Sequence, residues 1–201
     1  MTKDHESWTH SSAEIRRAYE FARAAHESVA QLRKYTKEPY IVHPVAVAEL
    51  VATVPHTKAM LQATLLHDTV EDTNVTLEDI EREFGGEVRE LVYWLTDASQ
   101  PMDGNRAVRK AIDREHISKA PVAAKTIKLA DLIHNSQTIL AFDRKFAMVY
   151  MPEKAALLEV LADGDSTLYE RAVKQVGLWA GPLGEKDIFA QERVLNERRS
   201  G

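Results

Sequence analysis

Hydrophobic residues recur with a helical period along most of the chain, from about residue 11 to about residue 176. Apolar positions three or four residues apart give each segment one apolar stripe, whereas a half-buried strand would alternate at every second residue. No stretch keeps that two-residue alternation for more than a few positions. The pattern predicts an all-α chain that folds as a single helical bundle, with no internal repeat and no linker.

Residues that start and stop helices divide this pattern into separate elements. Ser11 and Glu14 are spaced as a capping box and predict a helix to about Gln31. The charged stretch 33–40 breaks the period, and Pro44 suits the first position of the next helix. Further helices are expected at about 57–72, 76–84, 86–98, 105–117, 121–140, 152–162 and 166–176, and a charged final helix to about residue 197 after a break at 177–184.

Composition and charge narrow the class of protein. The 201 residues are 44% hydrophobic and 28% charged, as in a globular domain. There is no cysteine, which excludes disulfides, thiolate nucleophiles and cysteine metal ligands. A net charge of −5 argues against binding to a nucleic-acid polymer. We expect a cytoplasmic protein that does not bind membranes, because the chain has no targeting segment and no apolar run of about 20 residues.

The segment His-Asp-Thr-Val-Glu-Asp at 67–72 carries most of the candidate chemistry. At about 100° per residue, its four polar side chains fall within about 140° of one another on one face of a helix. His67 and Asp68 offer a nitrogen and an oxygen ligand to one divalent ion. Glu71 and Asp72 lean back toward that pair, because helical side chains point toward the N-terminus.

Two ligands do not hold a divalent ion tightly, so others are expected from elsewhere in the chain. The best candidates are His43 and Asp131, which lie in the apolar contexts YIVHPVAVA and IKLADLI, where an unpaired carboxylate would be costly. Taken singly, such residues are more often packed in a core or exposed to solvent. Four residues of ligand type on three predicted helices, with two further carboxylates one turn away, favour a metal site.

Three motifs in this order resemble the HD-domain metal-dependent phosphohydrolases: YIVHP at 40–44, LLHDTVEDT at 65–73 and KLADLIHN at 128–135. They are most similar to the alarmone hydrolases, which include the hydrolase half of RelA/SpoT enzymes and the stand-alone small alarmone hydrolases. The resemblance covers about residues 20–162. It implies one HD-type hydrolase domain over residues 1–201, in which residues 163–201 form a C-terminal helical extension.

The resemblance also implies an activity and a role for individual residues. The activity is removal of the 3′-pyrophosphate from alarmone nucleotides such as (p)ppGpp, which gives GDP or GTP and pyrophosphate. One divalent metal ion is implied, usually Mn²⁺ in this family. The implied residues are the metal ligands His43, His67, Asp68 and Asp131, the water-activating pair Glu71 and Asp72, and the substrate contacts Arg33, Lys34, Asn135, Thr138 and Tyr150.

Departures from the family pattern leave the preferred substrate open. Leu132 stands where Lys or Arg is common, and Ser136 and Gln137 replace a common Leu-Arg or Met-Arg pair. The spacing from His26 to Arg33 is also longer than usual. An adenine alarmone is therefore an alternative to a guanine alarmone.

Two other functions compete with alarmone hydrolysis. One is a different HD phosphohydrolase, such as a nucleotide or cofactor phosphomonoesterase, which would release inorganic phosphate. The other is a catalytically silent nucleotide-binding module, which would be expected to lack a metal ligand or one of the carboxylates Glu71 and Asp72. None of these is lost. The oligomeric state, the regulation and the role of the C-terminal helix are not predicted.

Overall fold

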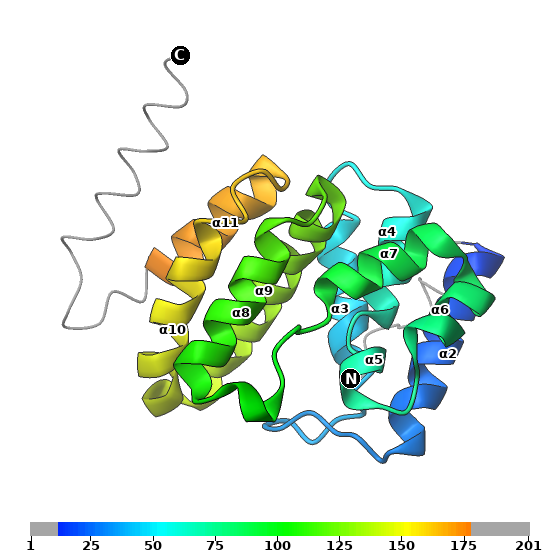
Figure 1. Ribbon diagram of the computed structural model, residues 1–201, viewed down its shortest axis with the longest axis horizontal. Helices are drawn as coiled ribbons and strands as arrows, with labels where there is room; N and C mark the ends of the chain where they lie inside the picture. The colour runs from blue at the N-terminus through cyan, green and yellow to red at the C-terminus, as the bar shows by residue number, and fades with distance from the viewer. Residues whose placement is uncertain (1–11, 178–201) are drawn as a thin grey trace.

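The computed structural model describes residues 12–177, and the elements in this range are helical (Figure 1). An isolated antiparallel bridge between Leu32 and Pro39 closes the loop after the first helix. The predicted all-α fold is confirmed. The elements are α2 (Ala13–Ser28), α3 (Val42–Val51), α4 (Lys58–Leu66), α5 (Thr69–Asp72), α6 (Leu77–Phe84), α7 (Gly86–Leu95), the 3-10 helix η1 (Pro101–Asp103), α8 (Arg106–Ser118), α9 (Val122–Phe142), α10 (Arg144–Leu158) and α11 (Ser166–Gly177).

Several predicted helix ends are confirmed by the side chains that cap them. Thr76 and Asp79 form a capping box at the start of α6. Gly85 ends this helix with a φ of 87°, a left-handed conformation that glycine adopts without strain. Asn105 caps α8 by accepting a hydrogen bond from the backbone N–H of Val108 at 3.2 Å. These local hydrogen bonds account for boundaries that the sequence located correctly.

The start of α2 and that of α3 differ from the prediction. The N-cap of α2 is Ser12, whose hydroxyl accepts a hydrogen bond from the backbone N–H of Ile15, so the capping box that begins at Ser11 is wrong. The helix ends at Ser28, before the predicted end. In α3, Pro44 is the third residue and not the first. Proline is tolerated there because the first-turn N–H groups have no helical partner. Ser11 and the predicted final helix lie outside the described residues.

The helix predicted over residues 57–72 is interrupted at His67 and Asp68, which separate α4 from α5. Near this interruption, side chains bond to backbone carbonyls. The Thr64 hydroxyl donates to the carbonyl of Met60, and the Thr69 hydroxyl donates to the carbonyl of Leu66, each at 2.7 Å. Side-chain hydrogen bonds of this kind accompany helix ends and bends. The interruption places His67 and Asp68 at a turn inside the bundle.

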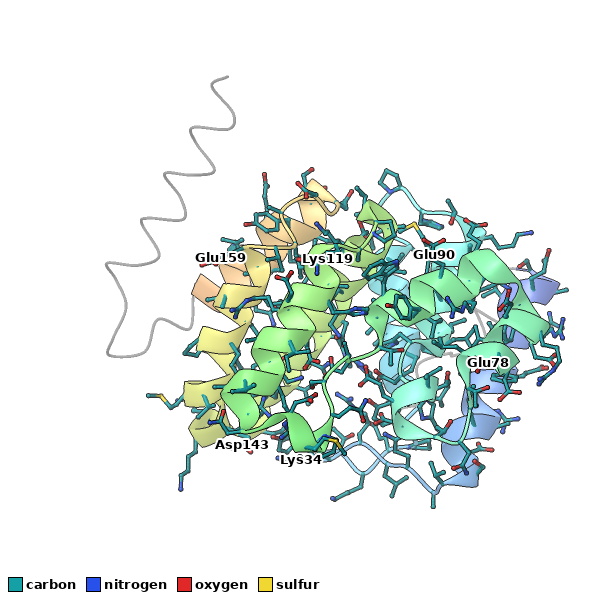
Figure 2. All side chains as sticks on the ribbon, viewed as in Figure 1. Lys34, Glu78, Glu90, Lys119, Asp143 and Glu159 are labelled. Atoms are coloured by element: carbon teal, nitrogen blue, oxygen red, sulfur yellow. The ribbon has the colours of Figure 1, made fainter. Side chains whose placement is uncertain are left out.

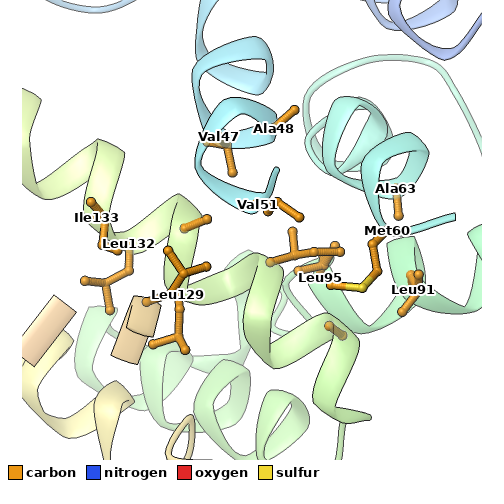
Figure 3. Packing of buried hydrophobic residues seen from close by; sticks show 14 of the residues in the cluster. Val47, Ala48, Val51, Met60, Ala63, Leu91, Leu95, Leu129, Leu132 and Ile133 are labelled. Carbon is orange, nitrogen blue, oxygen red and sulfur yellow. The ribbon is translucent and has the colours of Figure 1, made fainter. Parts of the chain in front are cut away.

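The helix α9 lies at the centre of the molecule and packs against α3, α4, α7, α10 and α11. Figure 1 shows α8–α11 side by side in one half of the bundle and α2–α7 in the other half. In the close-up of the core, Leu129, Leu132 and Ile133 of α9 lie across from Val47 and Val51 of α3 (Figure 3). Burial of each large aliphatic side chain contributes about 1.5–3 kcal/mol to stability. This packing fixes α9 against the helices that carry the candidate ligands.

The last described helix belongs to the same core. α11 buries Leu168, Ala172 and Val176, and the side-chain amide of Gln175 donates to the carbonyl of Ile133 in α9 at 2.8 Å. Residues 166–177 are therefore integrated into the bundle, while the single-domain organisation of the whole chain stays a prediction. Among residues 12–177, none of the helices has the length and apolar character needed to cross a bilayer. The cytoplasmic location stays a prediction.

Candidate metal centre and adjoining cavities

The four predicted metal ligands come from distant parts of the chain and meet beside α9. The His43 Nε2 atom lies 3.2 Å from Asp131 Oδ1 and 3.4 Å from Asp68 Oδ2. The His67 Nε2 atom lies 3.1 Å from Asp68 Oδ2 and 3.8 Å from Asp131 Oδ1. The ligand atoms of His43, His67 and Asp68 all lie within 4.8 Å of one another. Each of the two imidazole Nε2 atoms thus lies within 3.8 Å of a carboxylate oxygen from both aspartates.

The ring of His67 fits the requirement of a metal ligand. Its Nδ1 atom lies 2.7 Å from the carbonyl oxygen of Thr64, and because a carbonyl only accepts, Nδ1 carries the proton. The Nε2 atom then faces the carboxylates, 3.1 Å from Asp68 Oδ2 and 3.8 Å from Asp131 Oδ1. A divalent cation held by this donor set would replace the proton that Nε2 shares with these carboxylates.

His134 orients the second imidazole, and the sequence analysis missed it. Its Nδ1 atom lies 2.7 Å from His43 Nδ1, and the two rings stack with centroids 4.9 Å apart. Burial, followed by the neighbouring His43 and Arg33, lowers the pKa of His134 to about 4, so this ring is neutral at pH 7. His43 Nδ1 can then donate to His134 and leave Nε2 for the cation. The spacing of three residues from Asp131 to His134 could have revealed it, because it places both on one helix face.

The charges around the centre favour ionised carboxylates. Burial opposes ionisation of Asp68, but the neighbouring His67 holds the pKa of Asp68 below its usual range. Burial likewise opposes ionisation of Asp131, and Lys128, with its Nζ atom 3.5 Å from Asp131 Oδ2, helps to hold the pKa of Asp131 well below its usual range. The Tyr40 hydroxyl donates to Asp68 Oδ2 at 2.8 Å. Lys128 and Tyr40 were not predicted as site residues, although both lie in the quoted motifs.

The pKa of His67 reflects the excess of negative charge around the four candidate ligands. Burial opposes its protonation, but the charges of Asp68 and Asp131 outweigh burial and hold the pKa of His67 well above its usual value. A site that stabilises a proton on His67 between two carboxylates also attracts a metal cation. The cation competes with the proton for the lone pair of His67 Nε2. The electrostatics and the geometry therefore both fit a divalent ion.

The predicted acid pair separates in the structure. Glu71 lines a cavity of about 450 Å³ together with Asp68 and Asp131, and the backbone N–H of Asp97 donates to its carboxylate. Although Glu71 exposes part of its side chain, burial of the carboxylate, followed by the negative charge of Asp97, raises the pKa of Glu71 to about 7. A carboxylate with this pKa can accept and release a proton near neutral pH.

Asp72 points elsewhere, toward the loop that follows α2. Its Oδ2 atom accepts a hydrogen bond from the Gln31 side-chain amide at 2.8 Å. The Gln31 Oε1 atom in turn lies 2.6 Å from Nδ1 of the buried His26. Asp72 lines neither this cavity nor the one described below. The structure thus holds Asp72 in a defined position outside the cavities, and Gln31 is a site residue that the sequence analysis did not identify.

A second cavity of about 340 Å³ brings together four of the predicted substrate contacts. They are Arg33, Lys34, Asn135 and Thr138, joined by Tyr35 and Phe146 among others. Tyr40 and Asn135 line both cavities, so the two spaces adjoin each other beside the metal centre.

Hydrogen bonds connect the second cavity to the ligands. Arg33 donates to Asn135 Oδ1 at 3.4 Å, and the Asn135 side-chain amide donates to Asp131 Oδ1 at 2.6 Å. Lys34 lies at the rim, with a side chain 70% exposed and its Nζ atom 3.6 Å from Asp143 Oδ2. Figure 2 shows Lys34 and Asp143 at the same edge of the molecule. A cation at this rim is accessible to an anionic ligand.

The structure does not bring Tyr150 to either cavity. Tyr150 is 7% exposed and packs within the core. The positions that depart from the family pattern also lie outside the cavity walls: Leu132 and Ser136 are buried, and Gln137 is exposed. These departures therefore leave the residues that surround the metal centre unchanged.

Comparison with known proteins places this geometry in context. The family model described as HD domain matches residues 18–153. The chain is 42% identical over 128 residues to the guanosine-3′,5′-bis(diphosphate) 3′-pyrophosphohydrolase MESH1 of Xenopus tropicalis, which covers 62% of this chain and 68% of that relative. It is 40% identical over 126 residues to a probable GTP pyrophosphokinase of Mycobacterium leprae, covering 62% of this chain but only 16% of that protein. The chain thus spans about a sixth of the length of that longer relative.

A solved structure agrees with these sequence matches. It is described as a metazoan ortholog of SpoT that hydrolyzes ppGpp and plays a role in starvation responses. It superposes with a TM-score of 0.76 at 26% identity, over 86% of this chain and 98% of the other.

Proposed function

The chain belongs to the HD domain family, and from this premise we propose that it is a metal-dependent pyrophosphohydrolase acting on the 3′-pyrophosphate of alarmone nucleotides such as (p)ppGpp. The named activities of MESH1 in Xenopus tropicalis and Homo sapiens support this substrate class. One observation carries the proposal: two histidines and two aspartates lie close together, with the carboxylate of Glu71 in the adjoining cavity.

We propose that His43, His67, Asp68 and Asp131 hold one Mn²⁺ ion. Imidazole nitrogens together with hard carboxylate oxygens suit a first-row divalent cation of this kind. When bound, the cation polarises a phosphoryl oxygen and lowers the pKa of a coordinated water. The Nε2 atom of His67, which is buried 3.1 Å from Asp68 Oδ2 and 3.8 Å from Asp131 Oδ1, supports this assignment.

The residues of the chain supply the proton transfer and the positioning. Glu71 accepts a proton from the attacking water, for which its pKa of about 7 is well matched. Asp72, held by Gln31, lines neither cavity, so it has no direct contact with the water in this proposal. The water oxygen bonds to the phosphorus next to the ribose, and the bond from that phosphorus to the ribose 3′-oxygen breaks. The 3′-oxygen takes up a proton, and the products are pyrophosphate and GDP or GTP.

The smaller cavity is proposed to receive the nucleoside. Arg33 and Lys34 supply positive charge at its wall and rim, while Asn135 and Thr138 offer hydrogen-bonding groups for the sugar. The contact from Arg33 to Asn135 supports a role for both in one ligand. Tyr150 enters this proposal only through packing, because it lines neither cavity.

Identification of the products tests the proposed function. The purified full chain is incubated with Mn²⁺ and with guanosine and adenosine nucleotides carrying a 3′-diphosphate or a 3′-monophosphate, and the products are separated by chromatography. We expect release of pyrophosphate from the 3′-diphosphates. Release of inorganic phosphate alone would indicate a phosphomonoesterase, and binding without turnover would indicate a silent module. Comparison of the guanosine and adenosine nucleotides shows which base the protein prefers.

A further inference from the structure

One positively charged side chain of the larger cavity, that of Lys154, has no role in the proposed hydrolysis. Lys154 of α10 lines this cavity together with Asp68, Glu71 and Asp131. Its Nζ atom lies 4.7 Å from the centroid of the Tyr150 ring. Within residues 12–177, the ammonium group of Lys154 has no hydrogen bond and no ion pair. Lys154 therefore presents to the cavity a positive charge that no direct ion pair holds.

Carboxylates near Lys154 are already paired with other cations. Lys110 lies 2.6 Å from Asp97 Oδ2 and 2.9 Å from Asp113 Oδ2. Glu153, the neighbour of Lys154 in sequence, receives two hydrogen bonds from Arg106 at 2.7 and 2.8 Å. These pairs leave Lys154 without a direct ion pair, although the charges of Asp131 and Asp97 act on it at longer range. An anion that enters from outside would supply a direct partner.

The burial of Lys154 also favours an anionic partner. Burial, followed by the positive charge of Lys128, lowers the pKa of Lys154 to about 8. An ammonium group that is removed from water without a partner is costly, and an anionic ligand offsets that cost. A phosphate group is well suited, because its oxygens form strong charge-assisted hydrogen bonds with lysine. Arg114 of α8 lines the same cavity and likewise has no ion pair with the described residues.

We propose that Lys154 binds the terminal phosphate of the 3′-pyrophosphate group and thereby selects diphosphates over monophosphates. This inference rests on the proposed function. The nucleoside lies in the smaller cavity, and the reacting phosphorus lies at the metal centre, which both cavities adjoin at Tyr40 and Asn135. The second phosphate of the 3′-pyrophosphate group points away from the nucleoside and enters the larger cavity. The terminal phosphate is the group that reaches Lys154.

Substitution of Lys154 by methionine tests the proposal, because methionine keeps the apolar contact with Tyr150 and removes the charge. Lys145→Met is the matched control, since Lys145 is an exposed lysine of the same helix and lines neither cavity. We expect Lys154→Met to lower kcat/KM for the guanosine 5′,3′-bis(diphosphate) by about 10-fold or more. The inhibition constant of the corresponding 3′-monophosphate should change by less than about 2-fold, and Lys154→Arg should recover part of the activity.

A substrate without 5′-phosphates and the product pyrophosphate show which phosphate group Lys154 contacts. A 3′-diphosphate without 5′-phosphates should lose activity in Lys154→Met by the same factor, and inhibition by pyrophosphate should weaken more than inhibition by orthophosphate. The proposal is overturned if the loss disappears when the 5′-phosphates are removed, or if the 3′-monophosphate is weakened equally. It is also overturned if Lys154→Met matches Lys145→Met while the wild-type protein releases pyrophosphate. Failure of the wild-type protein to release pyrophosphate would instead overturn the proposed function and this inference with it.

Discussion

The two imidazoles of the metal centre are each oriented through the ring nitrogen that faces away from the ligand cluster. His67 uses a backbone carbonyl, that of Thr64, whereas His43 uses a side chain, that of His134. A substitution cannot remove the backbone carbonyl of Thr64, but it can remove the side chain of His134. Partners of this kind fix the tautomer and the direction of the lone pair, so their loss weakens metal binding without removing a ligand.

Replacement of His134 by phenylalanine should weaken metal binding by about 10-fold to 100-fold, because the ring still stacks on His43 but no longer accepts the hydrogen bond from His43 Nδ1. Isothermal titration of the metal-free protein with Mn²⁺ measures the change. His56→Phe is the control, since His56 is exposed and its Nδ1 atom contacts only the carbonyl of Val54. Equal affinities in the two variants would contradict the orienting role.

Glu71→Gln should lower kcat by about 100-fold to 10,000-fold, because glutamine cannot accept the proton of the attacking water. Bound metal should stay close to the wild-type amount, as measured by elemental analysis after dialysis. Glu78→Gln is the control: Glu78 is an exposed acid on α6 and is labelled in Figure 2. Parallel loss of metal and turnover in Glu71→Gln would make Glu71 a ligand and not a base.

Single residues were predicted best where a motif fixes both identity and spacing. The four ligand-type residues lie close together, because each lies in a motif whose spacing survives the details of the fold, while their role as ligands stays a prediction. Asp72 does not reach the cavities, because the helical-wheel argument assumed a continuous helix through His67, and the interruption at that point changes the directions of the residues after it. The contact of Gln31 and the proposed role of Lys154 could not be found, because both depend on the approach of distant segments.

At the scale of elements, the turn between α10 and α11 packs closely onto α9. A Cβ atom at Gly164 would lie 2.8 Å from Leu129 Cδ1, 3.2 Å from the Leu161 carbonyl oxygen and 3.3 Å from the backbone of Lys125. Two of these neighbours are backbone atoms and cannot move cheaply. The absence of a side chain at Gly164 therefore lets α11 approach the central helix.

Gly164→Ala should lower the free energy of unfolding by about 1–3 kcal/mol, the usual cost of overpacking a core. Chemical denaturation of the purified variant measures this change. Gly86→Ala serves as the matched substitution, because a Cβ atom there meets nothing within 4 Å. We expect its stability to equal or exceed that of the wild-type protein, since alanine favours helix more than glycine. A Gly164→Ala variant as stable as Gly86→Ala would show that the turn adjusts without cost.

Helices were predicted better than their ends. The 3.6-residue period identifies the existence of a helix, whereas its first residue depends on caps that the sequence offers in more than one place. For α10, Pro152 was interpreted as a first residue, yet the helix begins at Arg144 and includes it. The signal that could have located the start is Asp143, whose carboxylate accepts a hydrogen bond from the backbone N–H of Phe146. Pro152 is tolerated because the carbonyl that it leaves unpaired belongs to Met148, an exposed residue.

On the scale of the whole molecule, the ligands connect segments far apart in the chain: α3, the turn between α4 and α5, and α9. A cation bound to all of them is present only in the folded state. Mn²⁺ at about 100 times its Kd should therefore stabilise the protein by about 2.7 kcal/mol. Thermal unfolding with Mn²⁺ and with a chelator measures the difference as a rise in Tm. Asp131→Asn should abolish most of this rise, and an undiminished rise would place the cation elsewhere.

Tyr40 and Asn135 form the wall between two cavities, so the proposed activity would leave the two halves of a cleaved nucleotide in different spaces. Once the bond is broken under the proposed activity, the nucleoside part faces one opening and the inorganic part faces the other. Neither product has to wait for its partner to depart, and both can occupy the protein together. Under the proposed activity, we therefore expect the two products to leave in either order.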